Sequence, residues 1–214
     1  MMNLLSAEAQ ARFEGALLEL AQALKASRNS LKIKFTTFMQ TFNVVTATAI
    51  NGTQLFTAPL GIQSGNTTVP YGYWPFNGQQ FQQACAAILG FGFAANAGHP
   101  NAVTPIFNGC RLTFGQSGGG SEEISNVPIV NFPAGHGVYG TSEAGGATPA
   151  QQYYLSHNGI PAAPNRYNLP EAIVVGYNGT FSQRLDMDAL TLAPTTTVPV
   201  TMYMYTLFAN SVQT

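Results

Sequence analysis

Charged side chains are scarce in this chain. Lys, Arg, Asp and Glu together make up 8% of its 214 residues, whereas about 25% is typical of globular proteins. The 76 residues from Phe35 to Cys110 contain none of these four residue types, and no lysine follows Lys34. Charged residues on the surface of a soluble monomer keep its copies apart. Their scarcity therefore favours a self-assembling structural protein over an enzyme.

Two further absences narrow the class of protein. The formal net charge is −1 and the isoelectric point is about 6.3, so the chain has no basic surplus of the kind that binds nucleic acid. The two cysteines, Cys85 and Cys110, are too few for a disulfide framework and form no CxxC pair that would hold a metal. We therefore expect no specific nucleic acid, no metal and no cofactor.

Neither a signal peptide nor a transmembrane helix is expected. Residues 1–6 lack the basic start of a signal peptide, and the segment after them carries Glu8, Glu14 and Glu19. The longest apolar stretch, Ala84–Ala95, contains two glycines and is shorter than the roughly 20 residues that span a bilayer.

Residues 6–28 are predicted to form an amphipathic helix, with Ser6 as its cap. Apolar side chains recur at spacings of three and four residues, which places them on one helix face. These residues are Leu5, Ala9, Phe13, Leu17, Leu20 and Leu24. A soluble β-domain does not need such a helix for its own core. We therefore expect residues 1–30 to be a separate helical arm, and all of these residues except Ala9 to contact another subunit.

Two other roles for this helix stay open. It is amphipathic with a slightly basic end, which would allow contact with a membrane surface, but its three glutamates weaken that alternative. Its length also allows about three heptads of a short coiled coil. We favour the contact in an assembly.

From Leu31 onward the pattern is that of strands. Apolar and polar residues alternate in several segments, and five Asn-Gly pairs occur, a dipeptide that favours tight hairpin turns. The expected strands are Leu31–Ile50 (one bent strand or a pair), Gln54–Ala58, Val103–Ile106, Arg111–Phe114, Val127–Phe132, Ala172–Tyr177, Arg184–Asp188 and Thr197–Leu207. Gln79–Leu89 is predicted to be a short inserted helix. Residues 31–214 are thus expected to form a single, mainly β, jelly-roll-like β-sandwich, whose strand order the sequence leaves open.

Two patterns raise the question of catalysis or metal binding. Gly115–Gly119 matches the G-x-S-x-G motif with Ser117 as the nucleophile, but the glycines after it disfavour the helix that this motif requires. His99, His136 and His157 are scattered over segments rich in Gly and Pro and form no HxH or HExxH pattern. We predict no catalytic residue and no metal ligand among them.

Asp186 and Asp188 are predicted to share one face of a strand with Arg184. The two carboxylates could supply oxygen ligands to a calcium ion. The adjacent arginine instead favours a solvated or salt-bridged face, and whether the pair binds a cation stays open.

An aromatic cluster surrounds the single tryptophan of the chain, in the segment Tyr71-Gly-Tyr-Trp-Pro-Phe76. Tyr71, Tyr73, Trp74 and Phe76 could stack on sugar rings if they are exposed. Aromatic residues bounded by proline are at least as often anchors that are packed into a neighbour or the core. The sequence therefore predicts either an interface or a glycan site here.

Taken together, these features resemble those of capsid and other virion proteins of icosahedral bacteriophages. The resemblance depends on the helical arm, the β-rich domain with one inserted helix, the long loops rich in Gly, Pro and Asn, and the few charges. It implies a jelly roll of two four-stranded sheets, a location in the virion, and partners that are copies of the chain and other virion proteins. The role would be that of a shell, vertex or decoration subunit. The alternative is a receptor- or glycan-binding spike or tail module with the helix as a trimerisation stalk.

Overall fold

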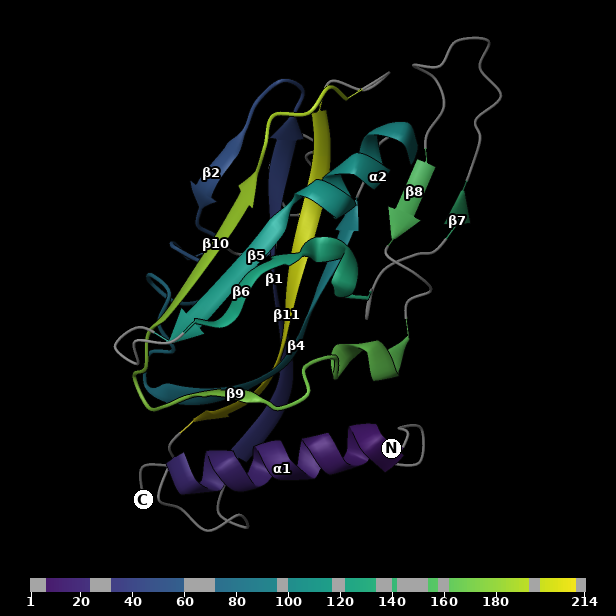
Figure 1. Cartoon of the computed structure of the whole chain (residues 1–214). Coiled ribbons are helices and arrows are strands. Elements are labelled where there is room, and N and C mark those ends of the chain that lie inside the picture. Colours follow the sequence, from purple (N-terminus) through teal and green to yellow (C-terminus); the bar gives the residue numbers. More distant parts are fainter. Residues whose placement is uncertain are drawn as a thin grey trace.

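The chain folds into two antiparallel sheets and two α-helices over the residues that the structure describes (Figure 1). The structure is a computed structural model that describes residues 7–23, 32–59, 72–95, 100–116, 122–133, 140–141, 154–157, 162–192 and 197–210. The helices are α1 (Ala7–Ala23), α2 (Pro100–Gly109) and the short 3-10 helices η3 (Ile129–Asn131) and η5 (Ala163–Arg166). The strands are β1 (Lys32–Val45), β2 (Ile50–Thr53), β3 (Gly72–Tyr73), β4 (Ala84–Ala95), β5 (Arg111–Gln116), β6 (Glu122–Pro128), β7 (Gly140–Thr141), β8 (Tyr154–His157), β9 (Ile173–Val175), β10 (Phe181–Met187) and β11 (Thr197–Asn210).

The strands pair in a nested order. One sheet runs β3-β1-β11-β4-β8-β7 with β9 also paired to β4, and the second sheet runs β2-β10-β5-β6. Eight of the strands form antiparallel pairs from the outside of the sequence inward: β1 with β11, β2 with β10, β4 with β9, and β5 with β6. This is the arrangement that results when one long hairpin is wrapped into two facing sheets, and it defines a jelly roll. The predicted β-sandwich is confirmed, and the strand order is now known.

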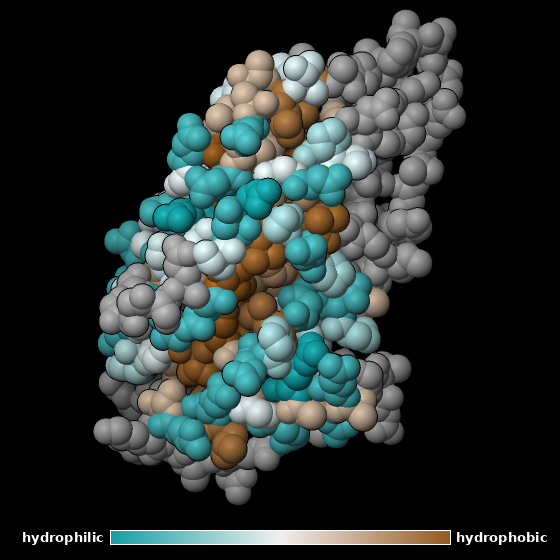
Figure 2. Space-filling model, viewed as in Figure 1, coloured by the Kyte–Doolittle hydropathy of each residue, from teal (hydrophilic) through white to brown (hydrophobic). Residues whose placement is uncertain are grey.

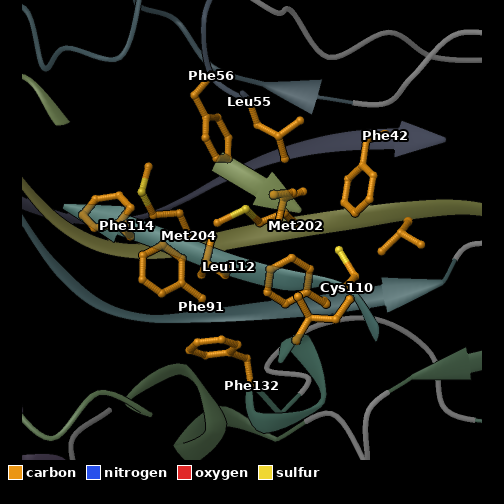
Figure 3. Close-up of a cluster of buried hydrophobic side chains, with 14 of the residues drawn as sticks. Phe42, Leu55, Phe56, Phe91, Cys110, Leu112, Phe114, Phe132, Met202 and Met204 are labelled. Atoms are coloured by element: carbon orange, nitrogen blue, oxygen red, sulfur yellow. The ribbon is translucent and has the colours of Figure 1, made fainter. Parts of the chain in front are cut away.

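The core lies between the two sheets and is built by alternation along the strands. In β11 the buried side chains Val198, Val200, Met202 and Met204 point into the main core, as the period of two in a strand requires. Across the interior, the ring of Phe91 in β4 lies 5.2 Å from that of Phe114 in β5, so the sheets meet through aromatic contacts (Figure 3). This core includes residues from every strand of the nested set, with Ile124 from β6 and with Ile173 and Val175 from β9.

The predicted helix at Gln79–Leu89 is wrong. Most of this segment belongs to β4, whose residues are all buried. The sequence suggested a helix because Phe81, Ala84, Cys85, Ile88 and Leu89 would lie on one side of it. In the structure β4 is covered on one face by the four-stranded sheet and on the other by α1, so apolar side chains are buried on both faces. Tertiary packing outweighs the local sequence pattern here.

The predicted strand at Val103–Ile106 is also wrong, because these residues lie in α2. The buried side chains of α2 are Ala102, Val103, Ile106 and Phe107, a spacing that places them on one helix face. Asn108-Gly109, expected to be a hairpin turn, ends this helix, and the Cys110 N–H donates to the Ile106 carbonyl at 2.8 Å. One inserted helix therefore exists, at a different place in the sequence.

Two shorter predictions are wrong in part. Gln54–Ala58 forms no strand, because β2 ends at Thr53. Val127–Phe132 contains only the end of β6 and then the 3-10 helix η3. The remaining predicted strands each overlap an observed strand.

A glycine in β4 marks a close approach of two segments. A Cβ atom on Gly90 would lie 2.6 Å from Asn168 Oδ1 and 2.8 Å from the Arg166 carbonyl oxygen. Asn168 is itself fixed there, since its Oδ1 accepts from the Phe91 N–H at 3.1 Å. Only glycine therefore allows the segment after η5 to lie against β4.

We expect Gly90→Ala to lower the free energy of unfolding by about 1–3 kcal/mol, because the added methyl group must displace backbone. Gly15→Ala is the matched control: a Cβ there meets nothing within 4 Å, and in a helix the change should add up to about 1 kcal/mol. Denaturant unfolding of both variants measures the two effects. Equal stabilities would contradict the close packing at Gly90.

Candidate functional site

Helix α1 lies across one end of the seven-stranded sheet, next to β9 (Figure 1). Leu20 is fully buried and Leu17 is 8% exposed. Both belong to a second apolar cluster on the outer face of the sheet, separate from the main core. Its buried members are Ala16, Leu17, Leu20, Cys85, Ala87, Leu89, Tyr167, Leu207 and Ala209.

Leu17 and Leu20, which we expected at an assembly contact, instead contact the chain's own sheet. Phe13 is half-buried beside the same cluster, with its ring 6.4 Å from that of Tyr167. Leu5 and Leu24 lie outside the described residues. In the single chain, α1 therefore covers an apolar patch that β4 and β11 would otherwise expose.

A hydrogen bond fixes α1 to the segment after η5. Arg12 Nη1 donates to the Tyr167 carbonyl oxygen at 2.6 Å, and Arg12 also pairs with Glu8 one turn earlier. Unlike Leu17 and Leu20, which are buried against the sheet, Leu18 is 57% exposed. The surface of α1 that remains available to a partner is thus the one that carries Leu18.

We expect Leu20→Ala to lower the free energy of unfolding by about 2–5 kcal/mol, because it leaves a cavity in a closed cluster. Leu18→Ala is the matched control and should change stability by less than about 0.5 kcal/mol. Urea denaturation of the two variants checks this. If Leu20→Ala leaves stability unchanged and impairs assembly, α1 is a separate arm after all.

The aromatic cluster around the single tryptophan lies inside the sandwich. Trp74 is fully buried and Phe76 is 8% exposed. Trp74 Nε1 donates to the Gly78 carbonyl oxygen at 3.0 Å, and the ring of Phe38 lies 5.0 Å from that of Trp74. Tyr73 is half-buried and stacked on Phe38, while Tyr71 lies outside the described residues. Trp74 and Phe76 are therefore core anchors, and neither offers a ring face to a sugar.

Asp186 and Asp188 do lie together, in a shallow pocket that Asn51 and Arg111 also line. Asp186 Oδ1 accepts from the Gly52 N–H at 2.7 Å, and its Oδ2 lies 3.4 Å from Arg184 Nε. Both oxygens of Asp186 are thus engaged by the chain itself. Among the described residues, no three His, Cys, Asp or Glu side chains gather where they could hold a metal ion.

The remaining candidates for chemistry are mostly outside the described residues. Ser117, His99 and His136 lie there, and β5 ends at Gln116, just before the serine. His157 is the last residue of β8, where it pairs with Ala94 of β4. Of these four residues, only His157 lies within the described part of the chain.

A polar cluster inside the sandwich was not predicted from the sequence. The amide cluster, as we call Gln40, Gln79 and Gln183, binds the backbone of Leu55 and Phe56. We call the segment Leu55–Thr57, which belongs to no strand, the strap. The Leu55 N–H donates to Gln183 Oε1 at 2.7 Å and the Phe56 N–H donates to Gln40 Oε1. Gln79 Nε2 in turn donates to the Leu55 carbonyl oxygen at 2.7 Å.

The sequence does contain a signal for this cluster. Gln40 lies between Phe38 and Phe42 at the inward phase of β1, and Gln183 lies between Phe181 and Leu185 at the inward phase of β10. A polar residue at a core-facing position of a strand needs a hydrogen-bond partner inside the core. An inward glutamine on two strands therefore predicts a buried polar segment between the sheets.

The two cysteines are buried in different clusters and do not form a disulfide bond. Burial raises the pKa of Cys85 from 9.0 to about 11 and that of Cys110 from 9.0 to about 12. Because the thiolate is the reactive form, both groups are chemically quiet in the folded chain.

We expect neither thiol to react with a disulfide reagent at about pH 8 until the chain is unfolded.

The raised pKa values also predict that the stability of the fold depends on pH. Well below pH 9.0 both thiols are neutral in either state, and from near pH 9.0 to about pH 11 the unfolded state loses protons that the folded state keeps. Stability should therefore fall over that range, and less steeply in Cys85→Ala and Cys110→Ala. Unfolding curves at about pH 8 and about pH 10 give the free energy of unfolding of the unsubstituted chain and of each variant. An equal loss of this free energy between the two pH values in all three proteins would contradict the prediction.

Comparison with known protein families and with curated proteins finds no match for this chain. None of its described helices has the length and apolar character needed to cross a membrane. The class that the geometry itself defines is a jelly roll, built on the eight nested strands, with a helix on its outer face.

Proposed function

We propose that this protein is a structural subunit of a virus particle, where it assembles with its own copies and with other virion proteins. The observation that carries the proposal is the surface of the described part of residues 35–110. Many of these residues are exposed, on β1, on β2 and in the segments that follow them, yet none is charged.

Exposed and uncharged residues are those that a shared surface requires. Interface cores are depleted in Lys, Glu and Asp relative to the rest of a protein surface. Val45 at the end of β1 is 41% exposed, with the exposed Asn43 two residues before it on the same face. An apolar band crosses the described surface beside β6 (Figure 2), and Val130, in η3 directly after β6, is 37% exposed.

The charged residues are gathered on other segments, although Asp186 and Asp188 lie beside β2. In the described residues they lie on α1, at the start of β1, around η5 and on the outer face of the four-stranded sheet, where Arg111, Arg184 and Asp186 are found. This division favours a subunit that keeps one part of its surface in water and shares another with its neighbours.

The fold supports a virion role by analogy. Double-sheet jelly rolls are recurrent in viral capsid proteins, and also in lectins and cupins, so fold alone does not decide between these functions. The low charge favours the capsid class. The glycan-binding alternative loses its main support, because Trp74 and Phe76 are buried in the core of the chain.

Native mass spectrometry and electron microscopy of the purified full chain test the proposal. Closed shells, sheets or defined rings are the expected result. A monomer that persists at high protein concentration would overturn it.

A charge-insertion experiment tests which surface is shared. We expect Asn43→Lys combined with Val45→Lys to raise the protein concentration needed for assembly at least about tenfold, because like charges would face each other or lose their water. Thr180→Lys combined with Ser182→Lys is the matched control. It adds the same charge at two exposed positions near Arg184 and should leave assembly within about twofold.

Light scattering against protein concentration measures the effect, and thermal unfolding confirms that each variant is folded. If both pairs of substitutions impair assembly equally, net charge and not this surface controls it. If neither does, the shared surface lies elsewhere.

A further inference from the structure

The strap is held in the sandwich in an unusual way. Leu55 and Phe56 are 2% and 0% exposed, as deeply buried as residues of the central strands. Their backbone groups nevertheless join no β-ladder and bond to the side chains of the amide cluster. The strap also accepts a backbone hydrogen bond, from the Gly78 N–H to the Thr57 carbonyl oxygen, at 3.0 Å.

Two local irregularities coincide at the strap. Phe56 adopts φ of +61°, a left-handed conformation that bulky residues rarely occupy and that surrounding structure must enforce. Gln183 Nε2 is buried and has no hydrogen-bond partner among the described residues. The two are directly linked, because the other amide atom of Gln183 accepts from Leu55, the residue before Phe56.

The strand that leads into the strap is also weak. β2 has four residues, and its pairing with β10 shifts register between Leu185 and Met187. By contrast, β1 and β11 pair without a shift from Lys32 opposite Asn210 to Val45 opposite Thr197. Releasing the strap therefore breaks the bonds to the amide cluster and the bond from the Gly78 N–H, and it leaves the ladder between β1 and β11 in place.

We propose that the strap is a conformational device that opens and recloses as a unit while the two sheets stay folded. Opening relaxes the backbone of Phe56 and frees the unpartnered amide of Gln183 to bond with water. It uncovers the ring of Trp74, which lies 5.2 Å from that of Phe56, and it exposes the side chains of Leu55 and Phe56 themselves. The open form thus presents a neutral, partly apolar slot that the closed form hides. This inference does not depend on the proposed virion role.

Hydrogen exchange on the full-length chain, resolved to single amides, tests the device without any substitution. We expect the amides of Leu55 and Phe56 to exchange at least about tenfold faster than the ladder amides of Phe42 and Met202, since local opening costs less than global unfolding. Exchange of all four amides at one common rate would overturn the proposal.

Variants separate opening of the strap from the loss of a single bond. Gln183→Met removes the partner of the Leu55 amide but leaves the Phe56 amide bonded to Gln40. If the strap moves as a unit, exchange at Phe56 should also accelerate at least about fivefold, and acrylamide quenching of Trp74 should rise. Acceleration at Leu55 alone would overturn the proposal.

Gln80→Met is the matched control, because the Gln80 side chain bonds to the Asn178 carbonyl oxygen and not to the strap. It should change exchange at Phe56 and quenching of Trp74 by less than about twofold. Gln40→Met provides a second test should Gln183→Met fail to fold: it must accelerate exchange at Leu55, whose bond to Gln183 it leaves in place.

Discussion

The ladder between β1 and β11 is the interaction on which the rest of the structure depends. Each of the two strands has 14 residues, and they pair over their whole length. β11 also pairs with β4 on its other side, so it forms the centre of the seven-stranded sheet. The inward side chains of β11 make one wall of the main core, and its outward Leu207 and Ala209 form part of the surface that α1 covers.

The scarcity of charge extends from the surface into the interior. Where the core has to hold an irregular backbone segment, the chain uses the neutral amides of Gln40, Gln79 and Gln183. A buried carboxylate or ammonium in these places would need a paired opposite charge to offset its desolvation. Neutral amides provide both donors and acceptors at a lower desolvation cost, so the same composition that suits a shared surface also suits this interior.

The sequence predicted the fold class and the helix α1, because spacings of two and of three to four residues report directly on local structure. It could not say what the apolar face of α1 covers, since a stripe shows that a face is buried and not against which surface. The error at β4 has the same origin: the apolar residues of Gln79–Leu89 would share one face of a helix, but those in β4 are buried on both faces of a strand, between α1 and the facing sheet. For the aromatic segment, the sequence allowed both a core anchor and a glycan site, and only the position of Trp74 beside Phe38 decides between them.

The central place of β11 has a consequence for how the protein is made. Residues 197–210 occupy the middle of the larger sheet, yet they leave the ribosome after all the other described strands. Until they emerge, β1 and β4 lack the strand between them, and the edges that later pair with β11 face water. Contacts between residues so distant in sequence form slowly, so a nascent chain has exposed strand edges for an extended time. During that time the edges of β1 and β4 that later pair with β11 can pair with a wrong neighbour.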